Sequence, residues 1–214
     1  MSADDKLKKA ILEELTWEPS VSPAHIGVTA KDGVITLLGH VETFAQKHAA
    51  ETAVRRVKGV TAVAEEIEVR LPFESKRGDD LIAAAAVDRL KWDVFVPGNV
   101  NIKVENGWLT LDGQVDWHYQ KTAAEQSLRT LVGVVGISNM ITIKPQVNTG
   151  EIGENIQHAL HRSWSFDPAI VVTADGGKVH LSGSVTSPYD RQIAATTAWA
   201  APGATSVEND IRVI

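Results

Sequence analysis

The chain contains one ten-residue pattern three times, and this repetition constrains its fold more than any other feature. The pattern is a turn dipeptide, an alternating apolar segment and a second glycine, at residues 32–41, 106–115 and 176–185, and a third glycine follows each copy. The spacing between copies is 74 and then 70 residues for each of the three glycines: Gly33, Gly107 and Gly177; Gly39, Gly113 and Gly183; Gly59, Gly133 and Gly203. Two spacings kept through three landmarks indicate three copies of one unit.

Each copy predicts a β-hairpin with one buried face. The dipeptides Asp-Gly, Asn-Gly and Gly-Gly tolerate the positive φ angles of a tight hairpin turn. After the first turn, Ile35 and Leu37 alternate with Val34 and Thr36, which is the period of a strand. We interpret these glycines as structural turn residues. They precede strands rather than helices, so they do not predict a phosphate-binding loop.

Apolar residues at helical spacing flank each hairpin. Leu7, Ile11 and Leu15 recur every four residues before the first hairpin, and residues 49–57 form a second stripe after it. Residues 60–69 predict a third strand, parallel to the second because a helix connects them. The sequence therefore predicts an α+β fold of three tandem αββαβ units, each a small three-stranded mixed sheet covered on one face by two helices. The expected domains are residues 4–72, 78–146 and 149–214.

Composition narrows the class of protein. The formal net charge is −6, and no basic stripe marks a nucleic-acid partner. There are no cysteines, which excludes disulfides, thiolate catalysis and cysteine-based metal sites. The polar start has no apolar run of the kind that a secretory signal needs. If this is the full gene product, we expect it to remain in the cytoplasm.

The closing motif of each unit adds a family resemblance. Gly-Val-x-x-Val, or a close variant, follows the second helix at 59–63 and 133–137, while 203–207 lacks the valine after glycine. Together with the αββαβ order and the paired glycines, this resembles the BON domain, a module of bacterial envelope and stress proteins. The resemblance implies a non-enzymatic module associated with phospholipid surfaces, with osmotic or envelope stress and, in some members, with ligand or cation binding. It implies no catalytic residue and no cofactor.

Two functions stay open at this point. The first is a binding or scaffold protein that associates with phospholipid surfaces or with a protein partner. The second is a cytoplasmic sensor of a small molecule or cation, with its site between domains. The oligomeric state is open under both hypotheses, and a set of soluble-ligand and lipid-binding measurements would separate them.

Polar residues with metal or acid–base potential have simpler explanations. His158 and His161 lie three apart on a predicted helix, but no third ligand has a clear spacing to them, so no metal site is expected. Glu65, Glu66 and Glu68 fall in the predicted third strand, where we interpret them as a solvated edge.

Aromatic residues divide into a repeated and an unrepeated group. Trp17, Trp92 and Trp164 each close the first helix of a unit, and this recurrence predicts packing. Unrepeated aromatics gather in the middle unit and predict an interaction surface, made of Phe95, Trp108, Trp117 and Tyr119. The alternative for this second group is burial where units dock together.

Overall fold

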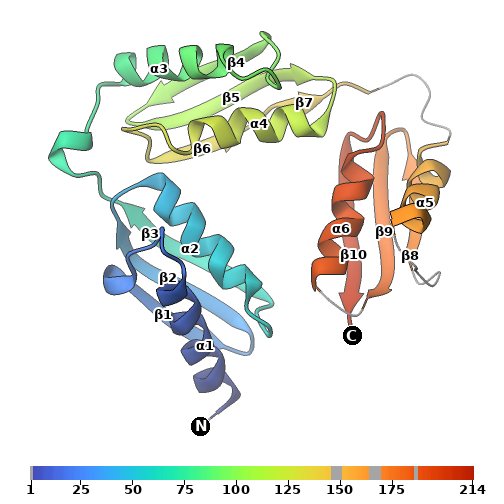
Figure 1. Ribbon diagram of the computed structural model, residues 1–214, viewed down its shortest axis with the longest axis horizontal. Coiled ribbons are helices and arrows are strands. Elements are labelled where there is room, and N and C mark those ends of the chain that lie inside the picture. Colours follow the sequence, from blue (N-terminus) through green and yellow to red (C-terminus); the bar gives the residue numbers. More distant parts are fainter. Residues whose placement is uncertain (1, 146–150, 164–169, 186–187) are drawn as a thin grey trace. The chain divides into compact units, whose positions relative to one another are not determined.

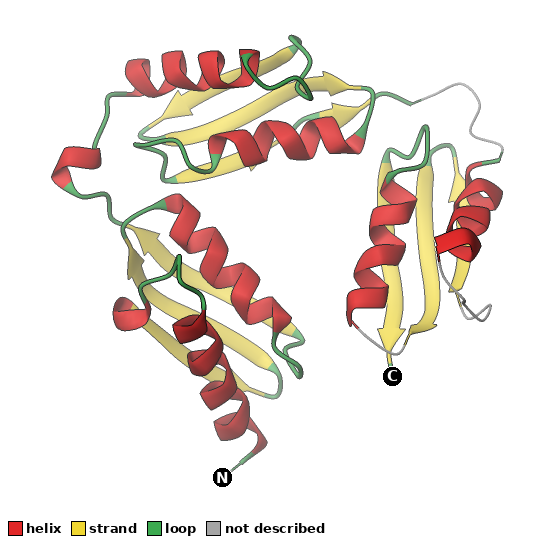
Figure 2. Ribbon diagram, viewed as in Figure 1, coloured by secondary structure: helices red, strands yellow, loops and turns green. Residues whose placement is uncertain are grey.

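The computed structural model describes residues 2–145, 151–163, 170–185 and 188–214, in which one order of elements recurs three times (Figures 1 and 2). The first repeat comprises α1 (Ala3–Trp17), β1 (Ile26–Lys31), β2 (Val34–Val41), α2 (Phe44–Arg56) and β3 (Ala62–Val69). The middle repeat comprises α3 (Asp79–Lys91), β4 (Val100–Glu105), β5 (Trp108–Val115), α4 (His118–Leu128), β6 (Gly136–Asn139) and β7 (Thr142–Ile143). The third repeat comprises α5 (Ile152–Ser163), β8 (Ile170–Asp175), β9 (Lys178–Val185), α6 (Pro188–Trp199) and β10 (Ser206–Val213).

Each repeat has its own sheet, and the predicted αββαβ order and mixed pairing are confirmed. In the first sheet β2 lies between β1, which is antiparallel to it, and β3, which is parallel. The third sheet has the same order and directions. The middle sheet differs because its last strand is divided into β6 and β7, both paired with β5. The register is nevertheless common, since parallel partners are 28 residues apart in each repeat (34 to 62, 114 to 142, 178 to 206).

Two helices cover one face of each sheet and leave the other face open (Figure 2). In the first repeat the core joins both helices to the central strand, with Ile11 and Leu15 from α1, Leu37 from β2 and Val54 from α2. The third repeat has an equivalent core of its own. The predicted inward residues are therefore confirmed as buried, and each large apolar side chain contributes about 1.5–3 kcal/mol by its removal from water. Among the described helices, none is both long and apolar enough to cross a bilayer.

The second glycine of the pattern is required by a close backbone approach. Gly39 has a φ of 119°, and a Cβ there would collide with the carbonyl oxygen of His25. Gly113 has a φ of 131° and meets the carbonyl of Asn99 in the same way. Any L-side chain would be strained at these positions, both by its φ angle and by the collision. The glycines at the hairpin turns also have positive φ, as the sequence predicts.

The expected packing of the repeated tryptophans is wrong. Trp17 is 83% exposed and Trp92 is 87% exposed. The buried stripe of α1 runs through Ile11 and Leu15, and two further residues rotate the helix by about 200°. Trp17 therefore points away from the sheet, and Trp92 stands in the same relation to the buried Leu90. Trp164 lies outside the described residues.

Candidate interaction surfaces

An exposed turn follows α3 in the middle repeat. Trp92 is 87% exposed, Val94 is 90% exposed and Phe95 is 58% exposed. Asp93 organises the turn, because its Oδ1 accepts a hydrogen bond from the Phe95 amide at 3.0 Å and its carbonyl accepts one from the Val96 amide at 3.1 Å. Ordered backbone thus presents three apolar side chains to solvent. We call Trp92, Val94 and Phe95 the apolar loop.

Tyr119 of α4 extends the apolar loop. The rings of Phe95 and Tyr119 meet edge to face, with centroids 6.0 Å apart and planes at 89°. Such pairs add about 0.5–1.5 kcal/mol beyond the area that they bury. Tyr119 remains 53% exposed. The structure therefore brings together two of the four aromatics that the sequence assigns to an interaction surface.

The other two aromatics have structural contacts of their own. Trp108 lies on β5 with its ring packed over Gly136, and its Nε1 donates to the Ser138 Oγ at 2.9 Å. Trp108 is 46% exposed, so it lies on the open face of the sheet while its ring covers a glycine. Trp117 is half-buried at the entry of α4, where its amide donates to Gln120 Oε1 at 3.0 Å. Both residues stabilise the fold locally as well as lining its surface.

Sequence reasoning missed Trp92 and Val94 as surface residues. A usable signal was present, since Trp-Asp-Val-Phe places three apolar residues in four positions between the end of a helix and Pro97. The position of Trp92 relative to the buried stripe of α3 is a second signal for its exposure. Trp92 lies two positions beyond the last buried residue, Leu90, and so falls off the buried stripe.

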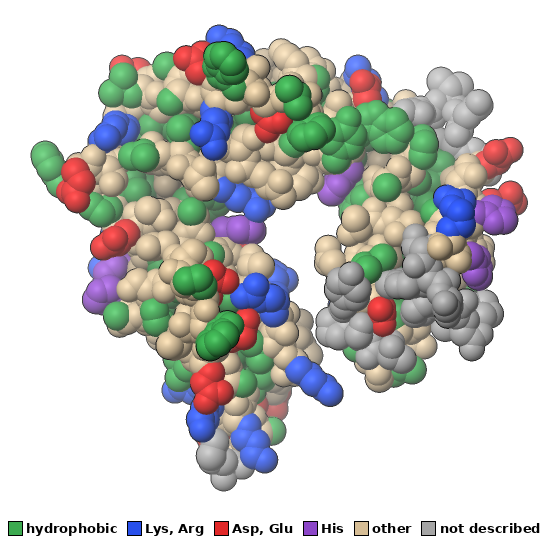
Figure 3. Space-filling model, in the orientation of Figure 1, with side chains coloured by type: hydrophobic (Ala, Val, Ile, Leu, Met, Phe, Trp, Pro, Cys, Tyr) green, Lys and Arg blue, Asp and Glu red, His purple; other side chains and the backbone are tan. Residues whose placement is uncertain are grey.

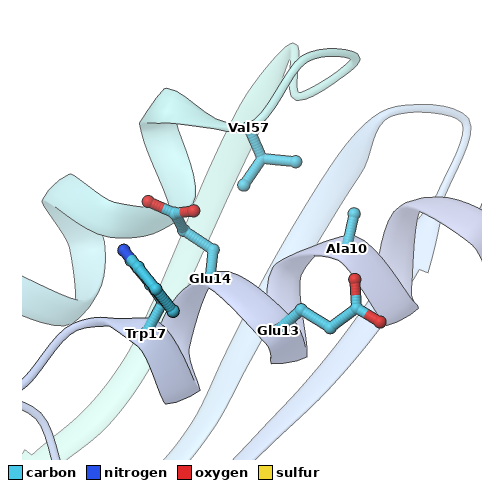
Figure 4. Close-up of a pocket in the computed structure, with 5 residues that line it drawn as sticks. All are labelled: Ala10, Glu13, Glu14, Trp17 and Val57. Atoms are coloured by element: carbon cyan, nitrogen blue, oxygen red, sulfur yellow. The ribbon is translucent and has the colours of Figure 1, made fainter.

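An open groove of about 430 Å³ lies beside Trp17 in the first repeat (Figure 4). The indole and the Glu14 side chain lie alongside one another on α1, and Val57 faces them from the end of α2. Arg56 pairs with Glu14 and with Glu18, each at 3.1 Å. Hydrogen bonds from Ser20 and then from Arg56 lower the pKa of Glu18. The carboxylates at this end of the groove are thus already partnered within the repeat.

Glu65 contradicts the predicted solvated edge. It is half-buried on β3, 3.9 Å from Lys47 of α2, and its Oε1 is buried without a hydrogen-bond partner. Burial raises its pKa above the ordinary value of 4.5. Asn139 occupies the equivalent position of the middle repeat and donates to the Lys121 carbonyl at 2.9 Å. Glu66 and Glu68 are exposed, as the sequence predicts.

Five of the seven histidines occupy three different settings. His158 and His161 are both exposed on α5. His180 of β9 pairs with Asp210 of β10 at 2.9 Å. His25 and His40 stack with ring centroids 4.6 Å apart. Within the part of the chain that the structure describes, no group of three or more potential ligands is arranged around a metal position.

Charged side chains of both signs are interspersed over the face shown in Figure 3. No large area of one sign interrupts this pattern on that face. The formal net charge of the chain is −6, so its overall charge is acidic.

Comparison with known proteins defines the class. A model of the BON domain matches residues 3–70, 78–145 and 148–214, so the chain belongs to the BON domain family. It is 28% identical to Osmotically-inducible protein Y of Escherichia coli (strain K12) over 144 residues, which cover 65% of this chain and 70% of that protein.

A solved structure also aligns along the chain. It is the C-terminal domain of CdsD, a structural protein of the type III secretion system of Chlamydia trachomatis, with 15% identity over 97% of each chain. The TM-score is 0.28.

Proposed function

We propose that this protein is a non-catalytic, osmotic-stress-related protein that binds phospholipid surfaces through the apolar loop of its middle repeat. The similarity to an osmotically inducible protein and the membership of the BON domain family support the stress-related, non-catalytic part. The observation that carries the lipid part is the exposure of Trp92 and Val94, at 87% and 90%, on an ordered turn.

The energetics favour weak and reversible binding. Full burial of an apolar side chain contributes about 1.5–3 kcal/mol, so three side chains supply several kcal/mol before the costs of association. Tryptophan suits the boundary between water and hydrocarbon because its ring is apolar and its N–H is polar. One small insertion of this kind resembles a single lipid anchor, which by itself gives only marginal membrane residence.

The net charge of the chain determines which kind of lipid surface it should prefer. An acidic chain is repelled by anionic lipid, and each basic residue near such a surface contributes only about 1 kcal/mol. We therefore expect binding to zwitterionic vesicles to exceed binding to anionic ones at low salt. Raising the salt concentration should narrow the difference because it screens the repulsion.

Co-sedimentation with phosphatidylcholine vesicles tests the proposal. The test variant replaces the apolar loop by Trp92→Ala, Val94→Ser and Phe95→Ser, which should remove most of the vesicle-bound fraction. Trp17→Ala is the matched control, because Trp17 is equally exposed at the same place in the first repeat. The proposal fails if wild type does not sediment with vesicles, or if the loop variant sediments as wild type does. Cross-linking in the absence of lipid would then test for a protein partner.

A further inference from the structure

An asparagine ties the second helix to the last strand in the middle and third repeats. Asn139 of β6 donates from Nδ2 to the Lys121 carbonyl of α4 at 2.9 Å, and its Oδ1 accepts from the backbone amide two residues later at 3.3 Å. Asn209 of β10 donates to the Arg191 carbonyl of α6 at 3.1 Å, and its Oδ1 accepts from the backbone amide two residues later at 3.2 Å. We call this arrangement the helix–strand clip.

The first repeat has a carboxylate where the clip has an amide. The spacings of 74 and 70 residues that relate the repeats align Glu65 of β3 with Asn139 and Asn209. The Oε1 atom of Glu65 is buried, and no described residue donates a hydrogen bond to it. An ionised carboxylate only accepts hydrogen bonds, whereas the clip needs a donor toward the helix carbonyl. The clip therefore cannot close in the first repeat while Glu65 is ionised.

The charged groups that face Glu65 come from α2. Lys47 lies 3.9 Å away, but it donates a hydrogen bond at 2.8 Å to a backbone carbonyl of β3. Glu51 and Arg55 follow along the helix and bind each other at 2.7 Å. On the other side, the partner of Glu65 on β2 is the fully buried Leu37, and the inward side chains of that strand are apolar. Burial raises the pKa of Glu65, Glu51 adds to this effect, and Lys47 and Arg55 oppose it.

We propose that the first repeat carries a pH-sensitive helix–strand clip, in which protonated Glu65 donates a hydrogen bond to the Lys47 carbonyl and so ties α2 to β3. Lys47 is the residue that aligns with Lys121, whose carbonyl is the acceptor in the middle repeat. A protonated carboxyl has one O–H donor and one carbonyl acceptor, which are the two functions that the asparagine amide supplies.

The direction of the effect follows from the raised pKa of Glu65 in the folded state. The stabilising contribution is fully present below the unfolded pKa and is lost as pH rises through the folded value. Mild acid therefore closes the clip of the first repeat. The clips of the middle and third repeats are made by amides, which do not titrate, so they stay closed over the same pH range.

Hydrogen exchange of the α2 and β3 amides, corrected for the intrinsic pH dependence of exchange, tests the proposal. In wild type their protection should rise several-fold as pH falls from 7 toward 4.5, the ordinary pKa of the carboxyl. Glu65→Asn copies the other two repeats, so it should be well protected at pH 7 and lose this pH dependence. Glu66→Asn is the matched control, because it removes a carboxylate from the adjacent exposed position of β3 and should keep the wild-type behaviour.

Asn139→Glu is the reciprocal test in the middle repeat. It should lower the protection of α4 at pH 7 and restore it as pH falls. The proposal is overturned if wild type and Glu65→Asn share one pH dependence, or if Glu65→Asn is less protected than wild type at pH 7. A folded Asn139→Glu variant with no new pH dependence in α4 would also overturn it. If that variant does not fold, the comparison within the first repeat decides.

Discussion

The first and middle repeats share a fold but differ in the loop after their first helix. The first helix of the first repeat ends at the exposed Trp17, and the exposed Trp92 directly follows the last residue of α3. In the first repeat the loop then turns polar, and Glu18 is fixed by Ser20 and Arg56. In the middle repeat Val94 and Phe95 follow instead. The two repeats therefore differ in surface loops whose side chains do not contribute to the αββαβ core. Such loops are the best places to look for residues with a function.

The largest expected loss of stability comes from truncating a core leucine, and we expect it to be of equal size in the first and middle repeats. Leu37 and Leu111 hold equivalent places on the central strands, and both are fully buried. Leu37→Ala or Leu111→Ala should each destabilise its own repeat by about 2–5 kcal/mol, through lost burial and the cavity left behind. Hydrogen exchange of strand amides measures each repeat separately. Unchanged exchange in either variant would contradict the equivalence of the two cores.

A smaller loss of stability is expected when alanine replaces the glycines that lie close to a neighbouring backbone carbonyl. Gly39→Ala and Gly113→Ala each force a Cβ toward a carbonyl, at His25 or Asn99, in a backbone conformation that L-residues avoid. Each substitution should destabilise its repeat by about 1–3 kcal/mol. Chemical denaturation with hydrogen exchange as readout would check this. If both variants are as stable as wild type, the backbone approach is not a constraint.

Trp108 offers a test specific to the middle repeat. A Cβ at Gly136 would overlap the Trp108 ring, so Gly136→Ala should destabilise by about 1–3 kcal/mol through overpacking. The first repeat has Val34 and Ala62 at the equivalent pair of positions. Val34 is smaller than Trp108, and Ala62 is larger than Gly136. In a Trp108→Ala background the Gly136→Ala penalty should largely vanish. A double-mutant cycle measures this coupling, and additive effects would show that the ring does not pack there.

Glu65 should make the first repeat sensitive to pH. Burial raises the pKa of this carboxyl in the folded state, so the protonated form favours folding. The contribution is fully present below the unfolded pKa and is lost as pH rises through the raised folded value. Glu65→Gln should therefore stabilise the first repeat at pH 7, by less than about 1 kcal/mol because the group is partly exposed. The gain should disappear below pH 4. A loss of stability at pH 7 would mean that the attraction to Lys47 outweighs burial.

Tryptophan removal should have the smallest effect on stability. Trp17→Ala and Trp92→Ala delete exposed rings, so each should change the free energy of unfolding by less than about 0.5 kcal/mol. Thermal melting measures this directly. A fall of several degrees in either variant would restore the packing role that the recurrence of these residues predicts.

Periodicity was sufficient to predict the fold from the sequence. The glycine spacing predicts three repeats, and the alternation around Leu37 predicts the buried face, because both report local backbone geometry. The helix-end tryptophans were predicted wrongly because recurrence was taken as packing. Recurrence records a position, whereas burial depends on helical phase, and Trp17 lies about 200° from Leu15 on the helix.

The candidate sites were less predictable because they depend on contacts between strands and across turns. The sequence predicts Phe95 and Tyr119 as surface residues. The exposure of Val94 depends on the turn that Asp93 organises, and the sequence pattern does not predict that turn. His25 and His40 are 15 positions apart, from 25 to 40, and no motif links them. Only the hairpin register brings their rings together.

The most direct test of lipid binding uses a fluorophore placed on the apolar loop. The chain has no cysteines, so Val94→Cys accepts one environment-sensitive label, and Ser20→Cys labels the corresponding loop of the first repeat as the control. Phosphatidylcholine vesicles should shift the emission of the label at position 94 to the blue and leave that at position 20 unchanged. No shift at position 94, or equal shifts at both positions, would contradict insertion through the middle repeat.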